Sequence, residues 1–214
     1  MTPSISFKTP AKVNLGLHIL GKREDGFHEL ETLFQMVNWC DEIKIECLSR
    51  GLELVCNQPD IPTDKGNLVI KAAHILQTRY PERCKGARIH LNKNIPHGAG
   101  LGGGSGNAAG VLLGLNFLWG LKLKREDLIS VASELGSDVP FFLFSPCAIG
   151  RGRGEILEPV KNSIRFYVLM VYPGFAVPTA SVYGNLKLKL TKRENNISIL
   201  KNFLLQSEFA QLGA

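Results

Sequence analysis

The chain has 214 residues, 44% of them hydrophobic and 21% charged, which is ordinary for one large globular domain or for one domain and part of another. No stretch approaches the roughly 18 apolar residues of a membrane span, and the N-terminus lacks the apolar core of a signal peptide, so we expect a soluble, cytoplasmic protein that engages no membrane. The net charge of +6 and the pI near 9.1 suit an anionic ligand or a nucleic acid, but the basic residues are scattered. The one candidate patch, residues 186–196, is interpreted as a solvated surface.

The cysteines and histidines indicate neither a metal centre nor a disulfide framework. The five cysteines are odd in number and lack CxxC or other zinc spacing, and the five histidines form no HExxH motif. We therefore expect reduced, mostly buried thiols and no metal site built by the protein itself.

The first part of the chain predicts strands. Residues 11–20 alternate between apolar and polar side chains, so Val13 would face a core while Lys12 and Asn14 face the other way, as in a half-buried strand. A turn is expected over residues 21–30. Three more strands are predicted at residues 31–39, 41–48 and 51–56, followed by a loop.

Helices and strands then mix without strict alternation. The pattern predicts a helix over residues 67–80, a strand over residues 86–95, and a helix over residues 124–136 that ends at Gly136 as its C-cap. Further turns and strands are predicted at residues 148–160 and 164–174, and a weakly indicated helix begins near residue 191. This mixture is typical of an α+β fold.

Residues 98–114 contain eight glycines and run directly into an apolar helix. Glycine is destabilising in an ordered segment unless the backbone needs left-handed angles or must approach something closely, so the cluster indicates a loop that receives a ligand. Ser105 or Asn107 is well suited to cap the helix. The N–H groups and positive dipole end of that helix would then form an anion site, with the glycines making room for phosphate.

Two other interpretations of this loop stay open, a flexible linker and a tight turn packed against a neighbouring helix. The segment lacks the lysine of the GxxxxGK[ST] motif and reads as no dinucleotide fingerprint. The residues alone therefore leave the class of phosphate ligand open.

Three other places offer candidate chemistry. Lys12 is either an exposed lysine or a functional one. Asp138 follows a helix end and precedes residues 141–144, which must be buried, so it is either a cap for the next segment or a functional carboxylate in a cleft of low dielectric. Phe27 and His28 place an aromatic ring beside a hydrogen-bonding ring, which suits recognition of a flat heterocycle or, equally, a packed turn.

Three segments carry a resemblance to a known family: PAKVNLGLHILGKREDGFHELETLFQ, PHGAGLGGGSGNAAGVL and LGSDVPFFL. They resemble the GHMP kinase superfamily and, within it, the kinases that act on a cytidine diphosphate-linked methylerythritol. The segment with the DGxH element is more specific than the glycine loop, because other members of the superfamily lack it. The resemblance implies ATP-dependent phosphorylation of the 2-hydroxyl of 4-diphosphocytidyl-2-C-methyl-D-erythritol, in the non-mevalonate route to isoprenoid precursors.

The resemblance also implies roles for individual residues. Asp138 would take the proton from the substrate hydroxyl, and Lys12 would stabilise charge on the aspartate and on the transferring phosphoryl group, with Mg²⁺ carried by ATP. The ATP site would comprise Pro96, His97, Gly98, Ala99, Gly100, Leu101, Gly102, Gly103, Gly104, Ser105 and Gly106, with Asn67 near the adenine. The cytidine site would comprise Asn14, Phe27, His28, Thr179 and Tyr183.

The fold that the resemblance implies has two domains. An N-terminal domain like domain 2 of ribosomal protein S5 would cover residues 1–152, and a ferredoxin-like domain would be cut short over residues 153–214. The family commonly reads GGGSS[ND]AA, and here Gly106 replaces the second serine, so a hydroxyl that could contact phosphate or Mg²⁺ is expected to be missing. The chain also stops at Ala214 without the glycine motif expected near the family's C-terminus, which would leave apolar surface exposed.

Three alternatives are kept. Another small-molecule GHMP kinase, such as a homoserine kinase, would not need Phe27, His28 and Tyr183. An RNA-binding module would need stacking aromatics among clustered basic residues, which the sequence lacks, so we expect no nucleic-acid partner. A catalytically impaired nucleotide-binding fragment would follow from the short C-terminus. We expect a monomer or a weak homodimer.

Overall fold

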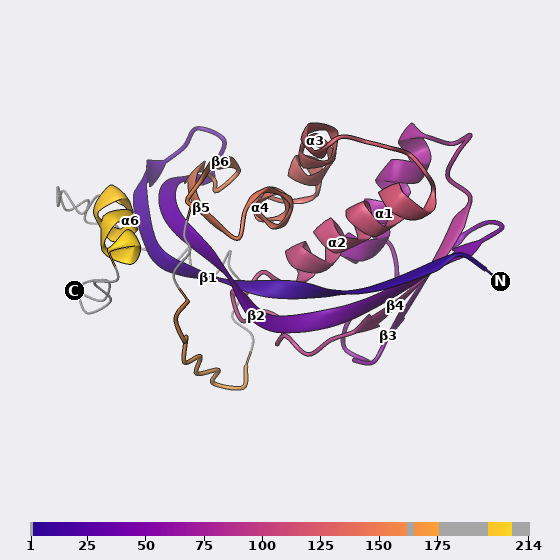
Figure 1. The fold of residues 1–214 in the computed structure, drawn as a ribbon, viewed down its shortest axis with the longest axis horizontal. Helices are drawn as coiled ribbons and strands as arrows, with labels where there is room; N and C mark the ends of the chain where they lie inside the picture. Colours follow the sequence, from indigo (N-terminus) through magenta and orange to yellow (C-terminus); the bar gives the residue numbers. More distant parts are fainter. Residues whose placement is uncertain (1, 162–164, 176–196, 207–214) are drawn as a thin grey trace.

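Figure 1 shows the fold in the computed structural model, which describes residues 2–161, 165–175 and 197–206. The strands are β1 (Ser4–Lys22), β2 (His28–Leu48), β3 (Leu52–Cys56), β4 (Gly86–Asn92), β5 (Cys147–Gly152) and β6 (Ile156–Pro159). The helices are α1 (Leu68–Arg79), α2 (Gly103–Leu118), α3 (Arg125–Leu135), α4 (Val139–Phe144) and α6 (Ile197–Leu205). The mixture of helices and strands confirms the α+β prediction.

A six-stranded sheet is organised around the long strand β2. β1 runs antiparallel to β2 along its length, while on the other side residues 42–48 of β2 pair with β4 and residues 30–35 pair with β5. β3 lies parallel to β4, and β6 pairs antiparallel with β5. The middle of β2 therefore has no strand between β4 and β5, and the chain that leaves β4 turns back onto this gap, where Asn94 and Ile95 donate to Asp41.

The two strands predicted at residues 31–39 and 41–48 are a single strand. β1 pairs with both halves and carries the ladder across the junction through a bulge at Pro10 and Ala11. Asp41 is the first residue of the second predicted strand. In the structure its carboxylate binds backbone N–H groups of the β4 side instead of ending the strand.

Helices α1, α2, α3 and α4 lie over one face of the sheet (Figure 1). The main core lies between these helices and the sheet and includes the fully buried Ile45, Ile89, Leu76, Leu112 and Leu115. None of the helices in the described parts of the chain is long and apolar enough to cross a membrane. All five cysteines are free thiols, and burial raises the pKa of Cys84 and of Cys147 to about 11.

The opposite face of the sheet, at its β5 end, is covered by α6. Neighbouring residues of β2 show the two faces, because Phe34 packs with Phe141 of α4 whereas Leu33 packs with Ile197 and Leu204 of α6. The helix predicted near residue 191 is thus present at Ile197–Leu205.

The strand predicted over residues 164–174 is wrong for the part that the structure describes. Residues 165–173 form no helix or strand, and the side chains of Tyr167, Leu169 and Val171 are almost entirely exposed. Their alternating pattern is that of a strand, but a strand forms only where a neighbour supplies hydrogen-bond partners.

Candidate active site

The polar side of β1 faces the interior at Lys12. The side chain of Lys12 is almost completely buried, so its interpretation as an exposed lysine is wrong, whereas Leu17 on the expected core side is 44% exposed. The alternation itself is correct. At Lys12 the burial is the reverse of the prediction because the glycine loop closes over this residue, whose backbone N–H donates to the Leu101 carbonyl at 2.9 Å, while Asn14 on the same side stays exposed.

Three groups surround the Lys12 ammonium. It donates to Asn14 Oδ1 at 2.7 Å, lies 3.7 Å from Asp138 Oδ2, and stands 5.5 Å from the centroid of the Phe34 ring. Asn14 in turn donates to the Thr32 hydroxyl at 2.7 Å, which fixes the orientation of its amide. A buried cation is stabilised only when it is paired in this way, so Lys12 is held in place and pointed at the acid.

Asp138 stands at the start of α4 but does not cap it. Its side chain makes no capping hydrogen bond, so the structure gives no support to the interpretation as a cap. The Asp138 side chain is 35% exposed while that of Lys12 is 7% exposed, so a ligand can reach the carboxylate from outside as the ammonium holds it from within. The predicted C-cap at Gly136, where α3 ends, is confirmed.

The glycine loop ends on the N-terminus of α2. Gly98, Gly100 and Gly102 have φ values of +70°, +74° and +67°, the left-handed region that glycine alone adopts easily. Gly102 is the N-cap and no side chain caps the helix, so the predicted capping by Ser105 or Asn107 is wrong. Both residues lie inside the helix. No side chain therefore accepts from the first N–H groups of this 16-residue helix. They face the loop, where an anion could accept from them.

The glycines serve two different purposes. A Cβ on Gly102 would lie 2.9 Å from Lys12 Cγ and 3.0 Å from the Phe142 ring, so this glycine lets the loop approach the buried lysine. At Gly100 a Cβ would meet nothing within 4 Å. By contrast, a Cβ on Gly106 would lie 2.8 Å from the Pro10 carbonyl oxygen. The Cα–Cβ direction at Gly106 therefore points toward β1.

The remaining residues of the predicted ATP site lie in or next to this loop. Pro96, His97 and Ala99 belong to the segment that joins β4 to α2. Gly104, the second residue of α2, lies next to the start of α1, since a Cβ on Gly104 would lie 4.0 Å from Leu68 Cδ1. Asn67 precedes Leu68 and caps α1, with its side chain accepting from the Val69 N–H at 2.9 Å.

The turn between β1 and β2 presents the ring of Phe27. This ring is 52% exposed, and its backbone N–H donates to Asp25 Oδ1 at 3.1 Å. Burial raises the pKa of Asp25, but the hydrogen bonds from the Phe27 N–H and the Arg23 guanidinium outweigh this effect and hold the pKa below its usual value. The Asp25 carboxylate is therefore charged and binds the backbone of the turn. Arg153, from the turn between β5 and β6, lies over the Phe27 ring at 4.8 Å from its centroid.

The β5–β6 turn connects this ring to the acid. A Cβ on Gly154, the neighbour of Arg153, would lie 3.9 Å from Asp138 Oδ1. Phe27 and Asp138 therefore lie on the two sides of one short turn, and His28 opens β2 beside Phe27. Thr179 and Tyr183 lie outside the described residues.

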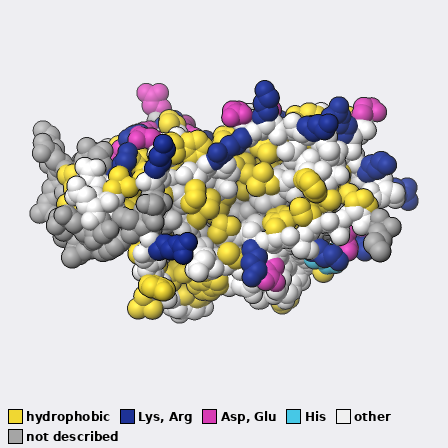
Figure 2. Space-filling model, viewed as in Figure 1, with side chains coloured by type: hydrophobic (Ala, Val, Ile, Leu, Met, Phe, Trp, Pro, Cys, Tyr) yellow, Lys and Arg dark blue, Asp and Glu magenta, His cyan; other side chains and the backbone are white. Residues whose placement is uncertain are grey.

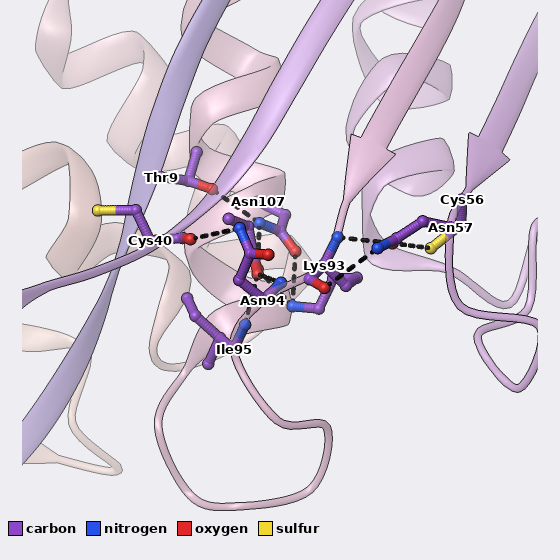
Figure 3. Close-up of polar contacts among 9 residues, drawn as sticks. Thr9, Cys40, Cys56, Asn57, Lys93, Asn94, Ile95 and Asn107 are labelled. Carbon is purple, nitrogen blue, oxygen red and sulfur yellow. Dashed lines mark hydrogen bonds and ion pairs between the residues drawn. The ribbon is translucent and has the colours of Figure 1, made fainter.

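The sequence pattern did not reveal a buried polar cluster at the base of the loop, shown in Figure 3. Asp41, Lys93, Asn107 and Thr9 are all less than about a tenth exposed and are joined by hydrogen bonds. A signal was present only in Lys93, a charged residue three positions before the loop. In the described parts of the chain, no group of three or more His, Cys, Asp or Glu side chains is placed to hold a metal ion.

The comparisons with known proteins concern the same segments. Residues 67–146, which contain the glycine loop and Asp138, match the family model described as GHMP kinases N terminal domain. The chain is 43% identical over 212 residues to the 4-diphosphocytidyl-2-C-methyl-D-erythritol kinase of Chlorobium phaeobacteroides, which covers 98% of this chain and 73% of that protein. The chain belongs to the family of 4-diphosphocytidyl-2-C-methyl-D-erythritol kinases.

Other members of the family agree with this assignment. The enzyme of the same name from Chloroherpeton thalassium is 47% identical over 178 residues, 83% of this chain and 62% of that protein. The chain thus spans 62% to 73% of the length of these two relatives.

Solved structures confirm the GHMP kinase fold. A crystal structure of a 4-(cytidine 5'-diphospho)-2C-methyl-D-erythritol kinase superposes with a TM-score of 0.77 at 36% identity and covers 95% of this chain and 72% of that one. A homoserine kinase from Cytophaga hutchinsonii reaches a TM-score of 0.64 at 21% identity over 100% of this chain and 71% of its own. That likeness shows the shared fold alone.

Proposed function

We propose that this protein transfers the γ-phosphoryl group of ATP to the 2-hydroxyl of 4-diphosphocytidyl-2-C-methyl-D-erythritol. One observation carries the proposal: the Lys12 ammonium lies 3.7 Å from the Asp138 carboxylate, and the Lys12 stem lies directly against Gly102 at the N-terminus of α2. A helix N-terminus attracts phosphate, so an acid, a cation and a phosphate site meet at one point. The substrate follows from the names of the family members.

The chemistry proposed for this arrangement is a direct phosphoryl transfer. The substrate hydroxyl oxygen forms a bond to the γ-phosphorus of ATP as the bond to the ADP oxygen breaks, and the hydroxyl proton passes to an Asp138 oxygen. Lys12 lies 3.7 Å from the Asp138 carboxylate and would stabilise the negative charge that spreads over the phosphoryl oxygens. Little else is needed, because such transfers depend mainly on position and electrostatics.

The glycine loop fits the ATP phosphates. GHMP kinases use ATP, and the loop offers left-handed glycines, open space at Gly100 and the uncapped N-terminus of α2. We propose that Mg²⁺ arrives bound to ATP and neutralises charge on its phosphates. Asp138 and the Ser105 hydroxyl supply oxygen groups of the kind that a hydrated Mg²⁺ ion prefers.

The two ends of the ligand pair are proposed to lie on either side of Asp138. Asn67 would lie near the adenine, since α1 begins beside Gly104. Phe27 and His28, with Asn14, would recognise the cytidine together with Thr179 and Tyr183 from outside the described residues. In this arrangement Asn14 both orients Lys12 and lies next to the substrate.

Several coarser features complete the proposal. We propose an S5-like domain over residues 1–152 and a ferredoxin-like part over residues 153–214, although β6, just beyond that boundary, pairs with β5 in the same sheet. We also propose a cytoplasmic monomer or weak homodimer that binds no nucleic acid. On the face shown in Figure 2, Lys and Arg side chains are spread among acidic and apolar ones, unlike the continuous basic stripe of a nucleic-acid site.

Replacing Phe27 with alanine is expected to weaken binding of the cytidine substrate and to leave ATP binding unchanged. The loss should be roughly 1–3 kcal/mol, the value of one aromatic ring stacked on a base. Substrate and ATP titrations monitored by calorimetry measure both effects. Phe117→Ala is the matched control, since Phe117 is 72% exposed on α2, away from this turn. Equal substrate binding by the two variants would remove Phe27 from the cytidine site.

The function itself is tested by incubating the protein with γ-labelled ATP and either 4-diphosphocytidyl-2-C-methyl-D-erythritol or homoserine. Label should appear on the cytidine compound and not on homoserine. Labelling of homoserine at a comparable rate would favour the other kinase of this superfamily. ATP binding without transfer to either compound would favour an impaired nucleotide-binding fragment.

A further inference from the structure

The buried carboxylate of Asp41 has four hydrogen-bond donors around it. Oδ1 accepts from the backbone N–H groups of Asn94 and Ile95, both at 2.8 Å. Oδ2 accepts from the Asn107 amide at 2.9 Å and from the Lys93 ammonium. The side chain is 0% exposed, so no water replaces these partners, and every lone-pair direction of the carboxylate is used.

These donors come from the two ends of the glycine loop. Lys93, Asn94 and Ile95 lead into the loop from β4, and Asn107 lies in the second turn of α2, where the loop has ended (Figure 3). A single side chain of β2 therefore fixes the distance between the point where the chain enters the loop and the point where it leaves. The loop between these points has three left-handed glycines and few side chains to hold its shape.

Asp41 also balances charge beneath the phosphate site. A Cβ on Gly103 would lie 3.0 Å from Lys93 Nζ, so the ammonium sits under the first turn of α2, where the helix dipole is positive. Lys93 is 6% exposed in its side chain and would be a buried, unpaired cation at this point without Asp41. Asn107 continues the network by accepting from Lys93 at 3.2 Å and donating to the Thr9 hydroxyl at 2.8 Å.

We propose that Asp41 is a positioning residue that sets the shape of the glycine loop for the ATP phosphates, so that its loss weakens ATP binding more than binding of the cytidine substrate. This inference rests on the proposed ATP site. Asp41 itself touches neither ligand. It acts through the backbone of residues 94–103 and through the first turns of α2.

Asp41→Asn is the first test. The amide keeps the shape of the side chain, but an NH₂ group replaces one of the two oxygens. Each oxygen accepts from two donors, so at either position two donors would face the NH₂ group and lose their acceptor. The dissociation constant for ATP–Mg²⁺ is expected to rise about tenfold or more, because small displacements of phosphate-binding groups have large effects, while that for the cytidine substrate stays within about twofold. Amide hydrogen exchange should accelerate in residues 94–104 without ligand.

Two further variants keep the test decisive if Asp41→Asn does not fold. Thr9→Val removes one acceptor at the edge of the network and should raise the ATP dissociation constant about two- to threefold. Asn116→Ala is the matched control: Asn116 ties the other end of α2 to Leu123 through bonds of 2.9 and 3.1 Å, so its loss lowers the melting temperature but leaves ATP binding unchanged.

The inference would be overturned if Asp41→Asn changed the dissociation constants of ATP and of the cytidine substrate equally. It would also be overturned if Thr9→Val and Asn116→Ala had the same dissociation constant for ATP. The exchange measurement needs no ligand and no turnover. It therefore tests the role of Asp41 even if the wild-type protein shows no phosphoryl transfer. A lack of phosphoryl transfer would count against the proposed function and not against the role of Asp41.

Discussion

Asp138→Asn is expected to lower kcat by about 10²–10⁴-fold while both ligands still bind. Asparagine keeps the shape of the side chain, but it cannot accept the substrate proton or hold a negative charge 3.7 Å from the Lys12 ammonium. Steady-state kinetics with the cytidine substrate, together with direct titration of each ligand, separate the loss of turnover from a loss of binding.

A true capping carboxylate provides the control for this variant. Asp127 accepts from the Lys124 N–H at 3.1 Å at the start of α3, so Asp127→Asn should change stability slightly and leave kcat unchanged. Lys12→Ala should lower kcat as much as Asp138→Asn does. The kcat of the double variant should be little lower than that of either single variant, because the two groups act as one unit. Losses that multiply in the double variant would mean that the two residues act independently.

Gly102→Ala is expected to lower kcat/KM by about 100-fold or more. The backbone at this position has a φ of +67°, which an alanine adopts only with strain. The added Cβ would also lie 2.9 Å from Lys12 Cγ, so both the N-terminus of α2 and the lysine must move. Displacing charged groups by a fraction of an ångström to one ångström is enough for a loss of this size. Initial rates measured over a range of ATP concentrations give the effect.

Gly120→Ala is the matched control, because Gly120 has a φ of +61° and a Cβ there would meet nothing within 4 Å. Both variants carry the backbone strain of a left-handed alanine, about 1 kcal/mol or more. Only Gly102→Ala should also lose activity. Similar kinetics in the two would show that the contact between Gly102 and Lys12 has no role in catalysis.

The sequence of β1 predicts which residues share a face but not which face is buried. Strand periodicity places Lys12 and Asn14 on the same side, and they are hydrogen bonded in the structure. The pattern predicts burial of the apolar side, because a lysine normally faces water. What covers Lys12 is the loop at Leu101 and Gly102, almost 90 positions later, and such a contact has no signal in the local pattern.

The glycine loop shows the same limit. Its composition correctly predicts a turn with left-handed residues that ends on a helix. It does not separate Gly102, which faces Lys12, from Gly106, which faces the Pro10 carbonyl, because both read as glycine in the same run. Asp41 reads only as the first residue of a predicted strand, since its partners lie more than 50 positions away.

The most direct test of the proposed function is a structure of the protein bound to a non-hydrolysable ATP analogue and 4-diphosphocytidyl-2-C-methyl-D-erythritol. We expect the triphosphate on the N–H groups that open α2, at Gly103 and Gly104, and an Asp138 oxygen about 2.6–3.2 Å from the 2-hydroxyl of the substrate. A triphosphate bound away from α2, or an Asp138 side chain turned away from the hydroxyl to cap α4, would contradict it.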